Sequence, residues 1–263
     1  MARKEIYAGG NPLRVVTLCS GYDSQCLALN RLGIPYELVA WSEIDKYAIQ
    51  AHDALFPQWA DRNLGDMTKI DWAQVPDFDL LTYSTPCQSI SSAGLQHGFT
   101  EGSGTRSSII WNVRDAIKVK RPRYLLLENV KAMVSKKFLP MFQLWCDEVE
   151  RLGYRNYHQV LNAKDYGVPQ NRERIFLVSI RDDVEQSFQF PKPQELTLTL
   201  DDVLEDEVER KYYLSHERIE GLLLSTLEEM KKKRGYKFTV KKKVTSPSAS
   251  PADVGGVERR TIL

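Results

Sequence analysis

The 263-residue sequence contains no apolar run approaching the roughly 18 residues that a membrane-spanning helix needs. Its first residues, Met1 to Ile6, lack the apolar stretch of a secretory signal peptide. Cysteine is scarce, and the four present show neither paired spacing nor a zinc-ligand pattern: Cys19, Cys26, Cys87 and Cys146. We therefore expect a cytoplasmic protein with free thiols and no metal site, neither a membrane protein nor a disulfide scaffold.

The sequence also lacks an excess of charge of one sign, since its formal net charge is +1. The charges are nevertheless unevenly placed, with an acidic run at 201–209 and a basic run at 231–243 that includes Tyr236 and Phe238. A basic run with aromatic residues suits contact with a phosphate backbone, although a solvated surface is an equally good interpretation. The candidates for nucleic-acid contact in this run are Lys232, Lys233, Arg234, Lys241 and Lys242.

Apolar strands alternate with amphipathic helices through the first two-thirds of the chain. The pattern predicts strands at 15–19, 36–41, 79–83, 124–127, 157–161 and 174–180. It predicts one helix that follows the first strand and ends near residue 32, and three more at 46–55, 107–120 and 139–152. This alternation predicts an α/β fold with a doubly wound, mostly parallel sheet covered on both faces. We expect one domain over residues 1–190, and a small, partial second domain over 191–263 with a helix near 215–233.

A cysteine behind a proline, in Pro86-Cys87-Gln88, follows the predicted strand at 79–83. Open α/β sheets build their binding sites at the carboxyl ends of such strands, and proline stiffens the loop that presents the thiol. From residue type alone, roughly two of three such cysteines are packing residues. Cys26 and Cys146 lie on the apolar faces of predicted helices, and we expect both in the core.

Three more polar segments lie at the ends of predicted strands: Ser20 to Ser24, Glu128-Asn129-Val130, and Gln170 to Arg174. In a mostly parallel sheet we expect these segments to come together with Cys87 at one edge. A thiolate nucleophile, a carboxyl that can donate a proton and a guanidinium suit attack on an electron-poor ring. Cytosine fits this chemistry: addition at ring carbon 6, with an acid at ring nitrogen 3, makes carbon 5 able to accept a methyl group.

Segments Ser84–Ser89, Glu128–Val130 and Gln170–Arg174 resemble, in order and spacing, three hallmark motifs of the DNA (cytosine-5) methyltransferases. The resemblance runs from about Arg14 to Ile180. It implies that Cys87 is the nucleophile and that Glu128 bonds the cytosine ring nitrogen 3 and exocyclic amine. Arg174, together with Arg172, would hold the carbonyl oxygen of the base and support the thiolate, whereas Asn129 would organise the loop. The alternative for Glu128 and the arginines is a structural ion pair.

The resemblance implies S-adenosylmethionine as the cofactor. Its binding segment would be Cys19, Ser20, Gly21, Tyr22, Asp23 and Ser24, at the start of a helix whose amide groups face the cofactor carboxylate. Glu43 would bind the ribose hydroxyls, Ile44 would pack on the adenine, and Asp66 with Met67 would lie at the adenine amine. Pro86 would complete this pocket, while Gln88 and Ser91, in the loop that carries Cys87, would contact DNA.

The sequence departs from the family pattern at several positions. Cys19 stands where the family has an aromatic residue that stacks on adenine, so we expect weakened cofactor binding. Asp23, Ser24 and Ser84 stand where the family has glycines. We do not find the Gly-Asn-Ser-Val-like segment that closes the family's cofactor pocket after the target-recognition region. We therefore expect a chain that lacks the carboxyl-terminal part of that region, with a second polypeptide as one possible source of the missing segment.

The favoured hypothesis is a bacterial or phage-like methyltransferase that flips a cytosine out of double-stranded DNA, as in restriction-modification. An RNA cytosine-5 methyltransferase is the alternative within the class, and a truncated, non-catalytic cofactor- or DNA-binding subunit is the alternative outside it. A thiol hydrolase would need a histidine base, and none of the four histidines has such a placement in the sequence: His52, His97, His158 and His216.

Overall fold

The computed structural model describes residues 11–90, 97–185 and 187–234. The chain divides into two compact units, one ending at Val203 and the other beginning at Leu204, compared with the division at residue 190 expected from sequence. Each unit is described by itself below. No helix in the described ranges is both long enough and apolar enough to cross a membrane.

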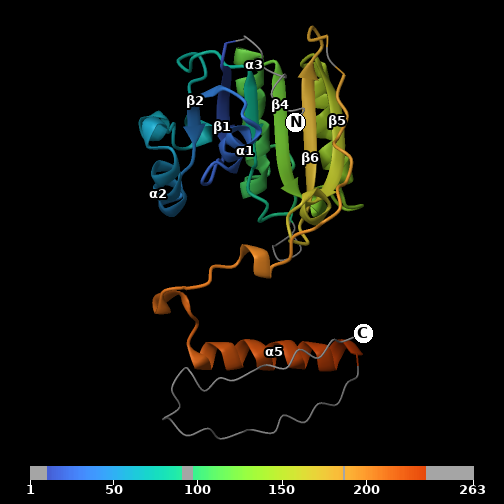
Figure 1. Ribbon diagram of the computed structural model, residues 1–263. Helices are drawn as coiled ribbons and strands as arrows, with labels where there is room; N and C mark the ends of the chain where they lie inside the picture. The colour runs from blue at the N-terminus through green and yellow to red at the C-terminus, as the bar shows by residue number, and fades with distance from the viewer. Residues whose placement is uncertain (1–10, 91–96, 186, 235–263) are drawn as a thin grey trace, which may run out of the picture. The chain divides into compact units, whose positions relative to one another are not determined.

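The first unit contains a six-stranded sheet in the order β2-β1-β3-β4-β6-β5 (Figure 1). Its strands are β1 (Leu13–Leu18), β2 (Tyr36–Ser42), β3 (Leu80–Tyr83), β4 (Tyr124–Val130), β5 (Tyr154–Asn162) and β6 (Glu173–Arg181). The first four strands are parallel to one another, whereas β6 runs antiparallel to both of its neighbours. The expected α/β class and mostly parallel sheet are therefore confirmed.

Two helices cover each face of the sheet, and the alternation of side chains along β1 shows this directly. Val16 and Leu18 belong to a core shared with α3 (Val113–Lys120) and α4 (Leu139–Arg151). Leu13 and Val15 belong to the opposite core, with α1 (Ser24–Leu32) and α2 (Lys46–Leu55). The predicted core cysteines are confirmed, because Cys26 and Cys146 are buried in these two cores.

The helix expected at 107–120 is regular only in its second half, because Arg106–Asn112 forms a 3-10 segment before α3 begins. The hydroxyl of Ser108 donates to the Thr105 carbonyl at 2.7 Å, and that of Ser107 donates to the Pro86 carbonyl at 2.6 Å. Serine hydroxyls that bond nearby backbone groups compete with regular helix formation. This segment therefore lies against the loop that carries Cys87 instead of continuing the helix.

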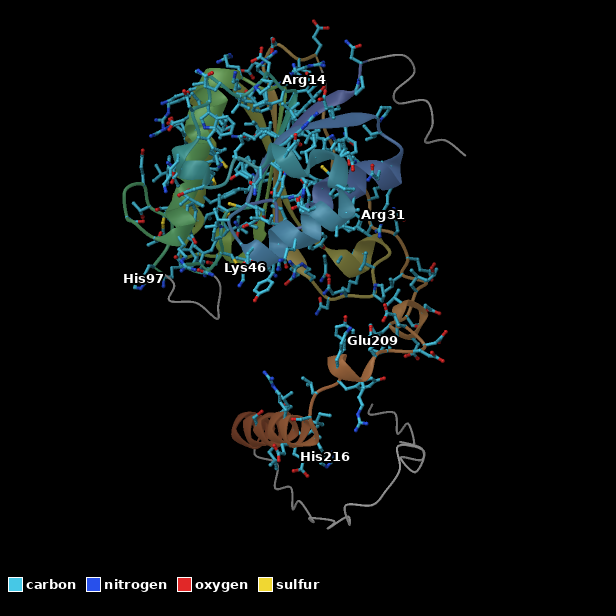
Figure 2. The ribbon with its side chains drawn as sticks, turned by 90° about the vertical axis from the view of Figure 1, so that its left-hand side faces the viewer. Arg14, Arg31, Lys46, His97, Glu209 and His216 are labelled. Carbon is cyan, nitrogen blue, oxygen red and sulfur yellow. The ribbon has the colours of Figure 1, made fainter. Side chains whose placement is uncertain are left out.

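The antiparallel direction of β6 decides which polar segments meet. In a wholly parallel sheet, Arg174 at the beginning of β6 would lie at the edge opposite the end of β4. In the antiparallel pair, Arg174 lies opposite Val130, the last residue of β4. The start of β6 thus shares an edge with the carboxyl ends of β3 and β4. Figure 2 shows Lys46 and His97 at this end of the unit and Arg14 at the opposite end.

The second unit contains α5 (His216–Arg234), close to the helix expected at 215–233. The first turn of this helix contains Glu217, and three successive leucines, Leu222 to Leu224, are exposed. The side chains of 227–234 and all residues from 235 onward lie outside the described part of the chain. The irregular tail expected at 245–256 is among the residues that are not described.

Candidate active site

The loop that carries Cys87 is held by side chains from two neighbouring segments. The buried amide of Asn129, near the end of β4, donates to the Thr85 carbonyl at 2.9 Å. Ser107 donates to the Pro86 carbonyl at 2.6 Å and accepts from the Ser89 amide at 3.2 Å. Cys87 itself is half-buried. The loop is therefore fixed on both sides of a thiol that remains partly accessible.

Asn129 makes only structural bonds, as expected from its position between Glu128 and Val130. Its side-chain oxygen accepts from the Val130 amide at 2.9 Å, which fixes the side-chain plane for the bond to Thr85. Ser107 was not identified from the sequence. A serine twenty residues beyond the nucleophile has no motif around it, and only the folded 3-10 segment brings it to Pro86.

Glu128 and Arg174 meet across β4 and β6. The Arg174 Nε lies 3.0 Å from Glu128 Oε1, and the two side chains are 22% and 28% exposed. Those exposures leave the carboxylate and guanidinium reachable from solvent at the edge of the sheet. Arg172 is exposed, and its backbone amide is bonded to the Asn162 side chain at 3.0 Å. The structure thus brings Arg174, but not the side chain of Arg172, into contact with Glu128.

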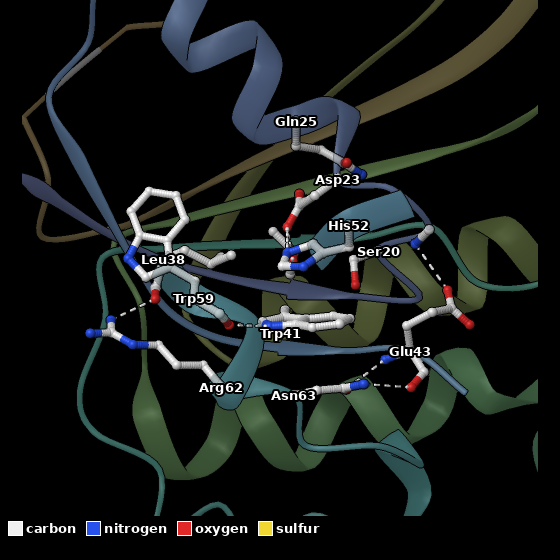
Figure 3. Close-up of polar contacts among 12 residues, drawn as sticks. Ser20, Asp23, Gln25, Leu38, Trp41, Glu43, His52, Trp59, Arg62 and Asn63 are labelled. Atoms are coloured by element: carbon white, nitrogen blue, oxygen red, sulfur yellow. Dashed lines mark hydrogen bonds and ion pairs between the residues drawn. The ribbon is translucent and has the colours of Figure 1, made fainter. Parts of the chain in front are cut away.

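The expected cofactor segment follows β1 and is tied to the end of β2 (Figure 3). The Gly21 amide donates to Glu43 Oε2 at 2.9 Å, in a left-handed backbone conformation that glycine adopts without strain. Ser20 is buried, and its hydroxyl donates to the Ser42 carbonyl at 3.1 Å. Ser24 is exposed at the start of α1. Ser20 is therefore a structural anchor, whereas Gly21 faces the Glu43 carboxylate.

Glu43 organises the end of β2. Its Oε1 accepts from the Ile44 and Asp45 amides at 2.8 and 2.9 Å, and Asn63 bonds both the amide and the carbonyl of Glu43 at 3.2 Å. Since Oε2 accepts one hydrogen bond among the described residues, from Gly21, it keeps a lone pair for a ligand hydroxyl. Asn63 was missed by sequence reasoning, and the turn-like Asn63 to Gly65 segment was its only signal.

The 63–67 segment lies along the same edge. Ser42 donates to the Gly65 carbonyl at 2.6 Å, and Met67 is buried. Hydrogen bonds from the Thr68 side chain and amide hold the pKa of Asp66 below its usual range. Asp66 is therefore an anionic acceptor, as binding to an amine requires.

The side chain of Asp23 is enclosed between β1 and α2. It is fully buried, accepts from Thr17 Oγ1 at 2.9 Å and lies 3.7 Å from His52 Nε2, while His52 stacks on Trp41 (Figure 3). Burial raises the pKa of Asp23. Asp23 also adopts a left-handed backbone conformation, with φ 64°, which aspartate tolerates better than most residues. Asp23 thus supports the expected cofactor segment through buried contacts with Thr17 and His52.

Cys19 and two exposed apolar residues complete the cofactor side. Burial raises the pKa of the Cys19 thiol to about 12, and its sulfur lies 3.5 Å from the Met67 sulfur. Ile44 is 74% exposed and Tyr22 is 52% exposed. Exposed apolar side chains beside a carboxylate with a spare lone pair fit a ligand with an adenine ring and a ribose. The residues present therefore fit S-adenosylmethionine.

The residues expected to contact nucleic acid are only partly described. Gln88 is exposed, and its side-chain oxygen accepts from Arg106 at 2.8 Å. Ser91, Lys241 and Lys242 lie outside the described residues. Lys232, Lys233 and Arg234 lie in the last turns of α5, where no side chain is described.

Comparison with known proteins identifies the family of this chain. The family model described as C-5 cytosine-specific DNA methylase matches residues 13–259. The chain belongs to this family. Its members use S-adenosylmethionine and methylate carbon 5 of cytosine in DNA. The match extends well beyond the 14–180 range in which the motifs were recognised.

Curated relatives include the type II methyltransferase M2.ScrFI of Lactococcus lactis subsp. cremoris, 37% identical over 79% of this chain and 71% of that protein. The orphan methyltransferase M.Rho11sI of Bacillus phage rho11s is 34% identical over 84% of this chain and 49% of that protein. The chain therefore spans about half to 70% of the length of such relatives, which come from bacteria and phages.

Solved structures confirm the fold. A DNMT2 mutant from Spodoptera frugiperda matches with a TM-score of 0.63 at 19% identity, covering 77% of this chain and 62% of that chain. The Entamoeba histolytica methyltransferase EhMeth matches with a TM-score of 0.64 at 17% identity, covering 80% and 65%. At these identities the likeness concerns the arrangement of the sheet and its helices.

Proposed function

We propose that this chain transfers a methyl group from S-adenosylmethionine to carbon 5 of a cytosine flipped out of double-stranded DNA, with Cys87 as the nucleophile. The observation that carries the proposal is the meeting of a half-buried thiol loop and the Glu128–Arg174 pair at one sheet edge, within a chain of this family. The same edge, at the ends of β1 and β2, offers the residues suited to the methyl donor.

Each residue has a role that its surroundings support. Cys87 adds to ring carbon 6 from a loop fixed by Asn129 and Ser107, and its sulfur leaves again when carbon 5, once methylated, loses its proton. Glu128 faces ring nitrogen 3 and the exocyclic amine, and a proton shared between Glu128 and nitrogen 3 stabilises the charge that this nitrogen gains as the ring accepts electrons. Arg174 holds Glu128 in place through Oε1 and donates from Nη1 to the Glu173 carbonyl at 2.8 Å, which leaves Nη2 to face the carbonyl oxygen of the base. Arg172 is proposed to join it once DNA is bound.

S-adenosylmethionine supplies an electrophilic methyl group when bound. Gly21 and Glu43 are proposed to hold its polar groups, and Ile44 to pack on its adenine. The side chain of Asp23 is proposed to support this segment and not to contact the ligand. Gln88, Ser91 and the basic residues of 232–242 are proposed to contact the DNA backbone, in which case binding weakens as salt rises.

The deciding experiment combines labelled methyl transfer with adduct trapping. The purified chain is mixed with labelled S-adenosylmethionine and duplex DNA, and separately with duplex DNA that contains 5-fluorocytosine. We expect label in cytosine and a stable protein–DNA adduct, both lost in Cys87→Ser. Cys146→Ala, at a buried cysteine of α4, is the control that keeps both signals.

The other outcomes are equally informative. Transfer that survives Cys87→Ser contradicts the proposed nucleophile. Transfer to tRNA in place of duplex DNA supports the RNA methyltransferase alternative, and cofactor binding without any adduct supports a non-catalytic subunit. Adduct formation by the isolated chain would also remove the need for the second polypeptide that the sequence led us to expect.

A further inference from the structure

The hydroxyl of Ser84 contacts the carboxylate that faces the base. Ser84 Oγ lies 2.6 Å from Glu128 Oε2 and 3.1 Å from the Glu128 backbone carbonyl. A hydroxyl has a single proton to donate, and the shorter distance is that of a charge-assisted bond. Because both acceptors belong to Glu128, the hydroxyl is committed to this residue in either orientation.

The sheet explains why these two residues meet. Tyr83 of β3 pairs with Leu127 of β4 in parallel register, and Ser84 and Glu128 are the next residues along each strand. Tyr83 and Leu127 are buried in the core, so the following residues face the other side of the sheet, where both are only partly buried. Ser84, just after β3, and Glu128 therefore form an oblique row with Arg174 of β6, which pairs with Val130, two residues beyond Glu128.

The row fixes both oxygens of one carboxylate. Arg174 Nε holds Oε1 at 3.0 Å, and Ser84 Oγ holds Oε2 at 2.6 Å. The terminal torsion of a glutamate side chain is broad, so one contact would leave the carboxyl plane free to turn. Two contacts on different oxygens define that plane. A carboxyl that must address a ring nitrogen and an amine of the same base needs both of its oxygens in the plane of the base.

The backbone around Ser84 does not depend on this hydroxyl. The Ser84 amide donates to the Leu18 carbonyl at 3.2 Å, and the next carbonyl, that of Thr85, accepts from Asn129. The end of β3 is thus held to β1 and β4 by bonds that survive removal of the serine side chain. Loss of the hydroxyl is expected to change the carboxylate and to leave the loop in place.

From these contacts we infer that Ser84 is a positioning residue, which orients the Glu128 carboxyl for the flipped base. The inference rests on the proposed function, since it assigns Ser84 a role in the same reaction. Ser84 touches neither the reacting atoms nor the methyl donor; it acts through Glu128. Sequence reasoning noted Ser84 only as a departure from the family glycine.

The test compares Ser84→Ala with Ser84→Thr, which keeps a hydroxyl. Ser179→Ala is the matched control, because Ser179 Oγ also donates at 2.6 Å to a side-chain oxygen, that of Asn156, near the other end of β6. We measure the single-turnover rate of methyl transfer, the KM for S-adenosylmethionine and the melting temperature of each variant.

We expect Ser84→Ala to lower the single-turnover rate about 10-fold, a part of the 10²–10⁴ that general acid–base groups contribute. The KM for S-adenosylmethionine should stay at the wild-type value, and Ser84→Thr should recover most of the rate. Ser179→Ala should react at the wild-type rate. A wild-type rate in Ser84→Ala, or equal losses in Ser84→Ala and Ser84→Thr, would overturn the inference.

Crystal structures of wild type and Ser84→Ala give a second measurement that does not depend on activity. We expect the Glu128 carboxyl to turn about its last bond in the alanine variant while it keeps the contact with Arg174. An unmoved carboxyl would overturn the inference. A wild-type chain that forms no adduct would contradict the proposed function, and the carboxyl orientation would still decide the role of Ser84.

Discussion

Replacement of Asp23 by asparagine tests the buried contact beneath the expected cofactor segment. Thr17 donates to Asp23 Oδ2 at 2.9 Å, and His52 Nε2 lies 3.7 Å from the same oxygen. Neither Asp23 Oδ1 nor His52 Nε2 has a hydrogen-bond partner, although both side chains are fully buried. A lone pair on Nε2 that faces a carboxylate is unfavourable unless a proton is shared between them. An asparagine with its amide nitrogen in the place of Oδ2 supplies that proton without a charge, and its second N–H can donate to the Thr17 hydroxyl, which then accepts instead of donating.

The pH dependence follows from the raised pKa of Asp23, which burial causes. A carboxyl with a higher pKa in the folded chain binds more protons when folded, so stability falls as pH rises from about 4 through the folded pKa. Asparagine carries no such titration, keeps a hydrogen bond with Thr17 and tolerates the left-handed backbone. We expect Asp23→Asn to stabilise the fold at pH 8 by about 1–3 kcal/mol, the cost of a buried polar group without a partner.

Thermal unfolding between pH 5 and pH 8 measures this effect. About 1 kcal/mol corresponds to roughly 2–4 °C in proteins of this size, so the gain at pH 8 should be visible and should shrink towards pH 5. Asp71→Asn, at an exposed aspartate that accepts from the Ala73 amide, is the control and should show no such trend. A melting temperature several degrees lower in Asp23→Asn at pH 8 would refute the reasoning. It would mean that the contacts of Asp23 with Thr17 and His52 depend on a carboxylate.

Three further predictions concern ligand binding and the nucleophile loop. Glu43→Gln should weaken S-adenosylmethionine binding about 10-fold by calorimetry, because the bond from the Gly21 amide to an ionised oxygen is lost; unchanged affinity would remove Glu43 from the site. Asn129→Ala should slow adduct formation and destabilise the fold by about 1–3 kcal/mol, since it frees the Thr85 carbonyl; an unaltered rate would show that the loop is held elsewhere. Lys232→Glu with Lys233→Glu should reduce the salt dependence of DNA binding by about two units of slope and leave cofactor binding intact; an unchanged slope would place the DNA contacts outside this run.

Much of the fold follows from local pattern. Strand β4 was evident as an apolar run, and α2 begins and ends at the expected residues because Asp45 caps it by accepting from the Tyr47 and Ala48 amides. The direction of β6 was not predictable in this way, since hydrophobic alternation is the same for parallel and antiparallel strands. That direction nevertheless determines whether Arg174 reaches Glu128.

The residues of the candidate site were predictable where they belong to a short motif. They were not predictable where a single side chain outside any motif holds those residues in place. Cys87, Glu128 and Arg174 were named from short motifs, and the last two are in contact. Asn63 and Ser107 have no motif, and their roles depend on segments brought together by folding. For Asp23, the motif predicted a role different from the one that its surroundings support. Its position in the expected cofactor segment suggested a ligand contact, but burial against Thr17 and His52 is decided by the sheet beneath it.

The proposed cofactor and base halves of the site are joined where the end of β1 pairs with the end of β3. The cofactor half begins directly after Leu18, the last residue of β1, and the base half begins directly after Tyr83, its partner in β3. The Ser84 amide donates to the Leu18 carbonyl, while the Ser84 hydroxyl donates to Glu128. One residue thus fixes the spacing between the strand that leads to the proposed cofactor segment and the carboxyl proposed to hold the base. Because methyl transfer requires the two ligands within bonding distance, Ser84 links their positions through two bonds from the same residue.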